Sequence, residues 1–327
     1  MGIQNLLRIT LVFTLCVILM GAYTRLSDAG LGCPDWPGCY GMMKVPSQHS
    51  ELMKAQDAFP GQQVEPKKAW LEMIHRYIAA ALGLLVLVIF ILCLKKPDAP
   101  KKLATIIAIL ILFQAALGMW TVTMKLMPVV VMSHLIGGFS LISLLLLLYL
   151  RTKPQGLPGA DLAAKRLAPL ALAGMGVLIL QIILGGWTSS NYAALACTSL
   201  PICEGNWYQN LQLTQAFNPF QGEHETYEFG VLDYYSRMTI HVAHRFGAIL
   251  TTGILLWLAY KLFTQSQSAL LKRAALVLTG LVILQVGLGI SNVVLHLPLG
   301  IAVSHNAGAA MLLLTLVFIN YALRRNT

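Results

Sequence analysis

The chain has 327 residues, of which 57% are hydrophobic and only 11% are charged. Soluble domains carry about 25% charged residues, so this composition excludes an ordinary soluble protein and indicates an integral membrane protein in a lipid bilayer. The net charge of +10 predicts no nucleic-acid partner, because the cations gather in short connections between apolar runs.

Eight apolar runs are long enough to cross the hydrocarbon core of a bilayer, which takes roughly 20 helical residues. We expect helices at 6–24, 70–94, 103–123, 128–150, 167–187, 238–262, 272–292 and 298–322. The first run is short, and a signal peptide is its other interpretation. No small-residue cleavage pattern follows it cleanly, so we expect a helix there as well.

Lysine and arginine residues set the expected orientation. They cluster in alternate connections and at the end of the chain, at Lys95, Lys96, Lys101, Lys102, Arg151, Lys153, Lys165, Arg166, Lys261, Lys272, Arg273, Arg324 and Arg325. The other connections are poor in cations for their length. The positive-inside rule therefore predicts that both termini are cytoplasmic and that the two long loops, 25–69 and 188–237, face outward.

Several sequence landmarks recur at a nearly constant offset. The motifs "CPDWPGC" and "CTSLPIC" start 164 residues apart (197 − 33), and the His-Arg pairs of "EMIHR" and "HVAHR" lie 169 apart (244 − 75). The motifs "VVMSHLIGG" and "IAVSHNAGA" are offset by 171 (305 − 134). The motifs "LFQAALGMW" (112–120) and "LQVGLGISN" (284–292) are offset by about 171, and "LQIILGGWT" (180–188) is similar to both. The repeat predicts two pseudo-symmetric four-helix bundles, 1–153 and 154–327, related by an axis along the membrane normal.

Four histidines occupy matched positions in these halves. His75 lies one turn and His134 about two turns into helices that enter from the outside, and His244 and His305 repeat these positions. A hydrogen bond to a neighbouring helix is the ordinary explanation of one such histidine. A pair of imidazoles on alternate helices, present twice, favours axial ligation of a heme in each half.

The residues around two of these histidines suggest further roles. Arg76 and Arg245 are candidate partners of heme propionates, or arginines that snorkel to the headgroups. Glu72 lies three residues before His75, on the same helix face and one turn nearer the outside, where the second half has His241. This carboxylate is a candidate catalytic residue, although the helix dipole alone would also favour an acid there. The first half is therefore predicted to be reactive and the second to relay electrons.

Four of the six cysteines form two pairs in the predicted outward loops, Cys33 with Cys39 and Cys197 with Cys203. An outward location is oxidising, which favours structural or redox-active disulfides. A thiolate metal site is the weaker option, because neither pair is a CxxC and no histidine flanks either pair.

Together these motifs resemble those of the heme A synthase family. The similarity covers essentially the whole chain and rests on "TRLSDAGLGCPDWPGCYG", "EMIHR", "KLMPVVVMSHLIGG", "GGWTSSNYAALAC" and "HVAHR". It implies an oxidoreductase that converts a ring methyl of heme O to the formyl group of heme A, by successive hydroxylation and loss of water. It also implies that His75, His134 and Glu72 hold the substrate heme, that His244 and His305 ligate a resident heme b, and that the cysteine pairs are associated with a disulfide.

The resemblance implies partners and a location too. Heme O would be the substrate, and heme O synthase (a farnesyltransferase), an electron-transfer partner and assembly factors of cytochrome c oxidase would be partners. The enzyme would lie in the bacterial cytoplasmic (inner) membrane, with its heme sites toward the periplasmic side. One alternative is a diheme b-type electron-transfer protein that acts with a quinone. Another is a transporter or heme-delivery protein, for which we would expect broken helices and a polar path near the midplane.

Overall fold

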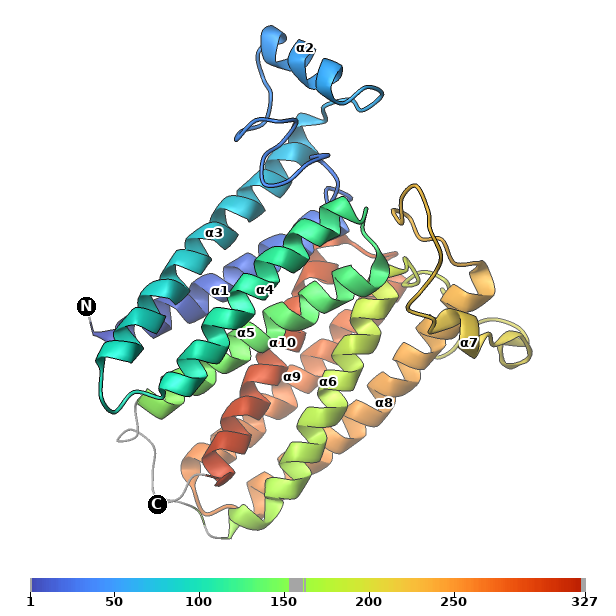
Figure 1. Ribbon diagram of the computed structural model, residues 1–327. Helices are drawn as coiled ribbons and strands as arrows, with labels where there is room; N and C mark the ends of the chain where they lie inside the picture. Colours follow the sequence, from blue (N-terminus) through green and yellow to red (C-terminus); the bar gives the residue numbers. More distant parts are fainter. Residues whose placement is uncertain (1, 153–160, 162, 325–327) are drawn as a thin grey trace.

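The computed structural model describes residues 2–152, 161 and 163–324, and all of the regular elements in this part of the chain are helices (Figure 1). Eight of them are long and apolar enough to cross a membrane. They are α1 (Ile3–Leu26), α3 (Pro66–Lys95), α4 (Lys101–Thr123), α5 (Pro128–Thr152), α6 (Ala168–Ser190), α8 (Tyr234–Gln265), α9 (Ala269–Val294) and α10 (Leu299–Arg324). The prediction of an all-α integral membrane protein with eight spans is confirmed.

The long helices pack as two rings of four. In the first ring α1 and α4 each contact both α3 and α5, and in the second α6 and α9 each contact both α8 and α10. Each ring has its own buried apolar core, and the rings meet where α1 and α5 contact α6 and α10. The division into two pseudo-symmetric halves stays a prediction, and its boundary at 153–154 lies outside the described residues.

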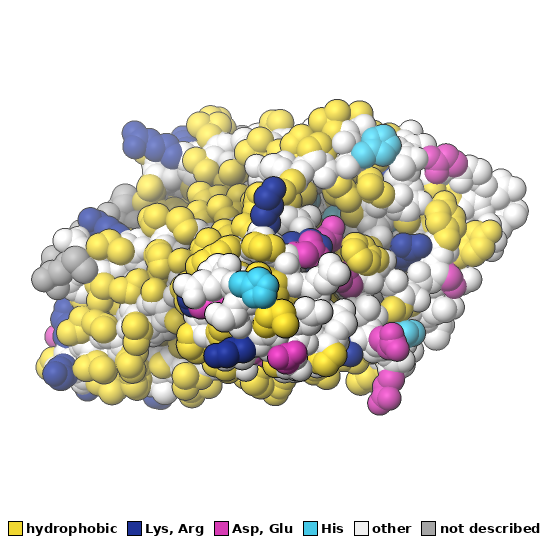
Figure 2. All heavy atoms as spheres, turned by 90° about the horizontal axis from the view of Figure 1, so that it is seen from above, with side chains coloured by type: hydrophobic (Ala, Val, Ile, Leu, Met, Phe, Trp, Pro, Cys, Tyr) yellow, Lys and Arg dark blue, Asp and Glu magenta, His cyan; other side chains and the backbone are white. Residues whose placement is uncertain are grey.

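The outer surface of the helices is apolar along the flank, as a lipid-facing surface requires. Large side chains such as Val12, Leu112 and Ile249 are exposed there. Seen from above, hydrophobic side chains cover the flank, and most of the visible Asp and Glu side chains lie toward the end that carries the long loops (Figure 2). Helix α1 begins and α10 ends at the same end of the bundle, opposite the long loops (Figure 1). The cytoplasmic location of that end stays a prediction.

Helices α3 and α8 extend outward beyond the ranges expected from hydropathy. They contain 30 and 32 residues, more than the roughly 20 that span a bilayer. Pro66 occupies the first turn of α3, where its missing N–H costs nothing. Asp233 caps α8, because its side chain accepts a hydrogen bond from Ser236 N at 2.7 Å. These extra turns extend the N-terminal part of each helix, which we call its head, into the long loops.

Short helices order the two long loops. The first loop contains α2 (His49–Ala58), and the second contains η3 (Trp207–Asn210) and α7 (Leu213–Ala216). Glu51 in the first turn of α2 forms an ion pair with Lys44 at 2.7 Å and accepts from the backbone of Ser47 and Gln48. The hydrogen bond from Lys44, followed by those two backbone bonds, lowers the pKa of Glu51 to about 2. These short helices and their hydrogen bonds give the two long loops a regular structure beside the ends of α3 and α8.

Asp161 ties the entry of α6 to the connection between α8 and α9. Its Oδ2 accepts from Ser266 Oγ at 2.6 Å and from the backbone N–H groups of Gln267 and Ser268 at 2.7 and 2.9 Å. Its Oδ1 accepts from the Ala164 N–H at 3.1 Å, just before the 3₁₀ turn η2 (Ala164–Leu167). Partial burial opposes ionisation, but these donors outweigh it and hold the pKa of Asp161 at about 2.

We expect this carboxylate to make stability depend on acidity. A group whose pKa falls on folding stabilises the protein above its unfolded pKa, near 3.9 for Asp, and this contribution disappears as the pH falls toward about 2. Asp161→Asn should lose about 1–3 kcal/mol at neutral pH, because the amide NH₂ would leave a donor that Asp161 now accepts from without an acceptor, and it should flatten the loss of melting temperature below pH 4. Thermal melting against pH checks this, with exposed Asp57→Asn as the control. Parallel pH profiles for Asp161→Asn and the unmodified protein would contradict it.

Candidate functional site

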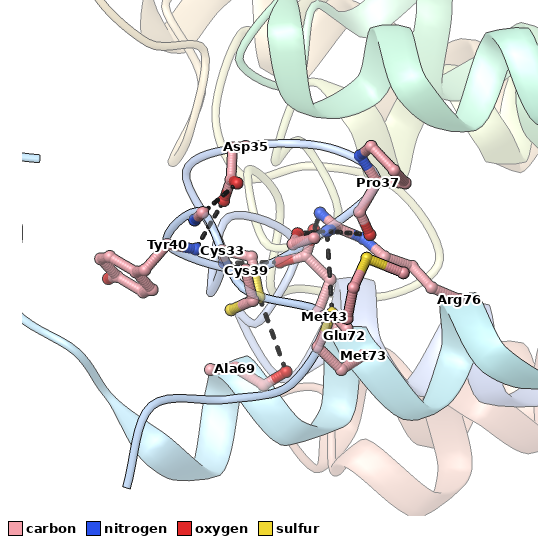
Figure 3. Close-up of a disulfide and its surroundings, with 12 residues drawn as sticks. Cys33, Asp35, Pro37, Cys39, Tyr40, Met43, Ala69, Glu72, Met73 and Arg76 are labelled. Atoms are coloured by element: carbon pink, nitrogen blue, oxygen red, sulfur yellow. Dashed lines mark hydrogen bonds and ion pairs between the residues drawn. A yellow bond between two sulfur atoms is a disulfide. The ribbon is translucent and has the colours of Figure 1, made fainter. Parts of the chain in front are cut away.

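The head of α3 meets the first long loop at Glu72. This side chain is only 5% exposed. Its Oε1 lies 2.5 Å from Arg76 Nη2, and its Oε2 accepts a hydrogen bond from the Cys33 backbone N–H at 2.9 Å (Figure 3). Both partners donate, and one of them is a cation, so the surroundings suit an ionised carboxylate. The candidate catalytic group is therefore held in place from both its helix and its loop.

Arg76 joins this carboxylate to the loop above it. Its Nη1 donates to the carbonyl oxygens of Gly38 and Pro37, the latter at 3.3 Å (Figure 3). The same guanidinium therefore pairs with Glu72 and fixes the loop against α3.

The cysteines predicted to pair form disulfides. The Cα atoms of Cys33 and Cys39 lie 4.8 Å apart and those of Cys197 and Cys203 lie 5.0 Å apart, both within the range that disulfides require. Gly32 lets the first loop approach α3, because a Cβ there would lie 2.6 Å from the backbone carbon of Lys68. The first disulfide thus anchors the loop segment that donates to Glu72.

The head of α8 repeats this construction with one substitution. Arg245 donates to the carbonyl oxygens of Ser199 and Cys197, each at 2.7 Å. Its Nε donates to Nε2 of His241 at 3.3 Å, where Arg76 has the Glu72 carboxylate. Both predicted propionate partners thus hold a disulfide loop, but only the first lies beside an acid.

The four histidines predicted as heme ligands are distributed over diagonal helices. His75 lies on α3 and His134 on α5, and both of these helices contact α1 and α4. His244 on α8 and His305 on α10 are arranged alike, on two helices that both contact α6 and α9. All four are partly buried. The structure therefore places one predicted pair in each ring of helices, and its role in heme ligation stays a prediction.

The surroundings of these rings fit a flat metal complex with axial imidazoles. Each of the four imidazoles faces a glycine on a neighbouring helix. A Cβ added at that glycine would lie 2.8–3.5 Å from a carbon of the imidazole. The glycines are Gly21 for His75, Gly118 for His134, Gly185 for His244 and Gly289 for His305. Nδ1 of His75, His134 and His305 is buried without a hydrogen-bond partner. These imidazoles are the residues that could hold heme iron.

One sizeable cavity lies away from this site. It has a volume of about 670 Å³ and lies between α5, α6 and α10, with Arg151 and Arg324 at its polar end. None of the predicted site residues lines it. The site is therefore defined by its side chains and not by this cavity.

Sequence reasoning missed the glutamines that contact the histidine-bearing helices. Gln181 Nε2 donates to the backbone carbonyl of His244 at 2.9 Å and lies 3.0 Å from its Nδ1. Gln285 Nε2 donates to the carbonyl of His305 at 3.1 Å. The repeated motifs "LQIILGG" and "LQVGLG" contain these glutamines, so their recurrence at a fixed distance before a glycine was the available signal.

Comparisons with known proteins find relatives over almost the whole chain. Residues 4–317 match the model of the COX15-CtaA family, described as cytochrome oxidase assembly protein. The chain is similar to heme A synthase of Shewanella oneidensis, with 73% identity over 99% of this chain and 97% of the relative. It is also similar to heme A synthases of Caulobacter sp. strain K31 (26% identity, 96% and 94% covered) and Mesorhizobium japonicum (25%, 95% and 87%).

Proposed function

This chain belongs to the COX15-CtaA family of cytochrome oxidase assembly proteins, and on that basis we propose that it is a heme A synthase. The reaction is the oxidation of a ring methyl of heme O to the formyl group of heme A. The observation that carries the proposal is the buried Glu72 held one turn from His75, in a chain 73% identical to a protein named for this activity.

The two halves have different tasks in this proposal. The half that contains residues 1–153 binds the substrate heme O between His75 and His134. The half that contains residues 154–327 holds a resident heme b between His244 and His305. Support comes from the substitution at the helix heads, where a carboxylate in the first half is replaced by the neutral acceptor His241 in the second. When bound, the resident heme supplies one-electron transfer.

Glu72 is the catalytic residue in this proposal. Removing electrons from a ring methyl leaves positive charge on the substrate, and a fixed carboxylate in a site of low dielectric stabilises that charge. The carboxylate would also accept a proton released from the reacting carbon, while the proposed electron-transfer partner would take up the electrons. Its hydrogen bond to Cys33 N fixes its position before the substrate arrives. Arg76 and Arg245 are the proposed propionate partners, which would connect the propionate edge of each heme to a disulfide loop.

The proposed location is the bacterial cytoplasmic membrane, with the histidine pairs toward the periplasmic side. The cation-rich short connections support this orientation, and the two disulfides fit an oxidising outer face. Proposed partners are a heme O synthase that supplies the substrate, an electron-transfer protein and assembly factors of cytochrome c oxidase. The alternative of a diheme protein acting with a quinone receives no support from the relatives, which are named heme A synthase.

Expression in cells that make heme O but no heme A tests this function. We expect heme A to appear in extracted membranes, as it should with the Shewanella oneidensis relative as positive control and not with an empty vector. The chain present in the membrane beside heme O alone would contradict the proposal.

A further inference from the structure

Three of the four histidines face the same pair of residues on a neighbouring helix. The pair is a glutamine followed four residues later by a glycine, and its glycine lies against the imidazole. The three instances are Gln114 and Gly118 facing His134, Gln181 and Gly185 facing His244, and Gln285 and Gly289 facing His305. The arrangement therefore occurs once in the first ring of helices and twice in the second.

The histidine-bearing helices are shaped to receive these glutamines. In each case a glycine follows the histidine by three residues, and any Cβ there would overlap the glutamine side chain. These glycines are Gly137, Gly247 and Gly308. At each contact, the glycine on the histidine-bearing helix leaves space for the glutamine side chain. The glycine on the glutamine-bearing helix leaves space for the imidazole.

In the second ring of helices the glutamine amide bonds to the proposed ligand residue itself. Gln181 Nε2 donates to the His244 carbonyl at 2.9 Å and lies 3.0 Å from His244 Nδ1, and Gln285 Nε2 donates to the His305 carbonyl at 3.1 Å. A carbonyl has two lone pairs, so it can accept this bond as well as its own helical bond. The third glutamine, Gln114, is 6% exposed, and its Nε2 has no hydrogen-bond partner. On the helix that it faces, Nδ1 of His134 also has no hydrogen-bond partner.

His75 lacks this contact. Gly21 faces its ring, with the Cβ position 2.8 Å from Cε1. The residue four before Gly21 is Val17, and the residue three after His75 is Ile78. Both belong to the apolar core of the first ring. Because Val17 stands where the other three contacts have a glutamine, no amide at this position can bond to His75. His75 lies on the same helix as Glu72.

We propose that Gln181 and Gln285 are positioning residues that fix His244 and His305 for heme ligation through their backbone carbonyls, and that His75 is the exchangeable ligand. The inference rests on the proposed function, because it takes the four histidines as heme ligands. A cofactor site benefits from two fixed ligands, and the second ring has both. A site that takes up heme O and releases product needs one ligand that withdraws. In the first ring of helices Gln114 packs against the helix of His134 without a hydrogen bond, and His75 lacks the glutamine altogether.

Isosteric removal of the amide tests the fixed ligands. In the purified full-length protein, Gln181→Met and Gln285→Met keep the side-chain length and lose the donor. Partners that orient metal ligands are worth about 10–100-fold in affinity, so we expect heme b to transfer to excess apomyoglobin about 10–100-fold faster. The low-spin electron paramagnetic resonance signal should broaden. Leu180→Ala and Leu284→Ala, at exposed neighbouring positions, are the matched controls and should behave as unmodified protein.

The reverse change tests the free ligand. Val17→Gln combined with Ile78→Gly installs the missing contact, and we expect heme in the first half to be released about 10-fold more slowly. Unmodified protein that binds no heme would overturn both the proposed function and this inference. Heme-loaded protein in which the Met variants and the double variant keep unmodified transfer rates and spectra would overturn this inference alone.

Discussion

Glu72→Gln is expected to abolish heme A formation while heme O still binds. The substitution keeps the shape and the contact with Cys33 N, but it removes the negative charge that faces Arg76. Groups that move protons or stabilise charge at this point of a reaction contribute about 10²–10⁴-fold to the rate. The measurement is the heme A to heme O ratio in extracts from cells that express equal amounts of each variant.

Glu65→Gln is the matched control for this change. Glu65 precedes α3 by one residue and pairs with Lys68 at the surface, with its side chain 61% exposed. We expect this variant to make heme A normally. Normal heme A production by Glu72→Gln, with heme O retained in the purified protein, would remove Glu72 from the mechanism.

His244→Ala and His305→Ala are expected to lose the resident heme. Each would remove one proposed iron ligand, so the loss should exceed the about 10–100-fold effect of residues that only orient a ligand. Heme b should then be absent from the purified variants, and heme A should no longer form. His134→Ala should instead keep heme b and lose heme O.

The exposed loop residue His224 provides the control, because His224→Ala removes an imidazole that bonds to the Gln221 carbonyl and packs against the Tyr227 ring, outside the membrane helices. Heme is measured by extraction and chromatography, together with the protein concentration. Full retention of heme b by His244→Ala would contradict the assignment of the second ring as the cofactor site.

Much of the fold could be predicted because bilayer thickness constrains a membrane chain so strongly. Runs such as 103–123 lie directly within the helix Lys101–Thr123, since no other local structure satisfies its backbone in lipid. The disulfides were readable as well, because two cysteines six residues apart in an outward loop have few other uses. The extra turns of α3 and α8 were not, because Pro66 and Asp233 act through local capping and not through hydropathy.

The candidate site could be predicted only in part. The histidines stood out because an imidazole is costly in an apolar helix. The hydrogen bond from Cys33 to Glu72 joins residues 39 positions apart, and that from Gln181 to His244 joins residues 63 apart. Pattern analysis within a single helix carries no information about such contacts. The repeat indicated that the glutamines mattered, but only the packing of neighbouring helices placed them against the histidines.

Heme extraction from the purified protein tests the central claim most directly. The protein is expressed with and without a supply of heme O, and its hemes are separated by chromatography. We expect heme b under both conditions, and heme O or heme A in addition only when heme O is supplied. Heme b alone under both conditions would contradict the claim that one half of this protein is a substrate site.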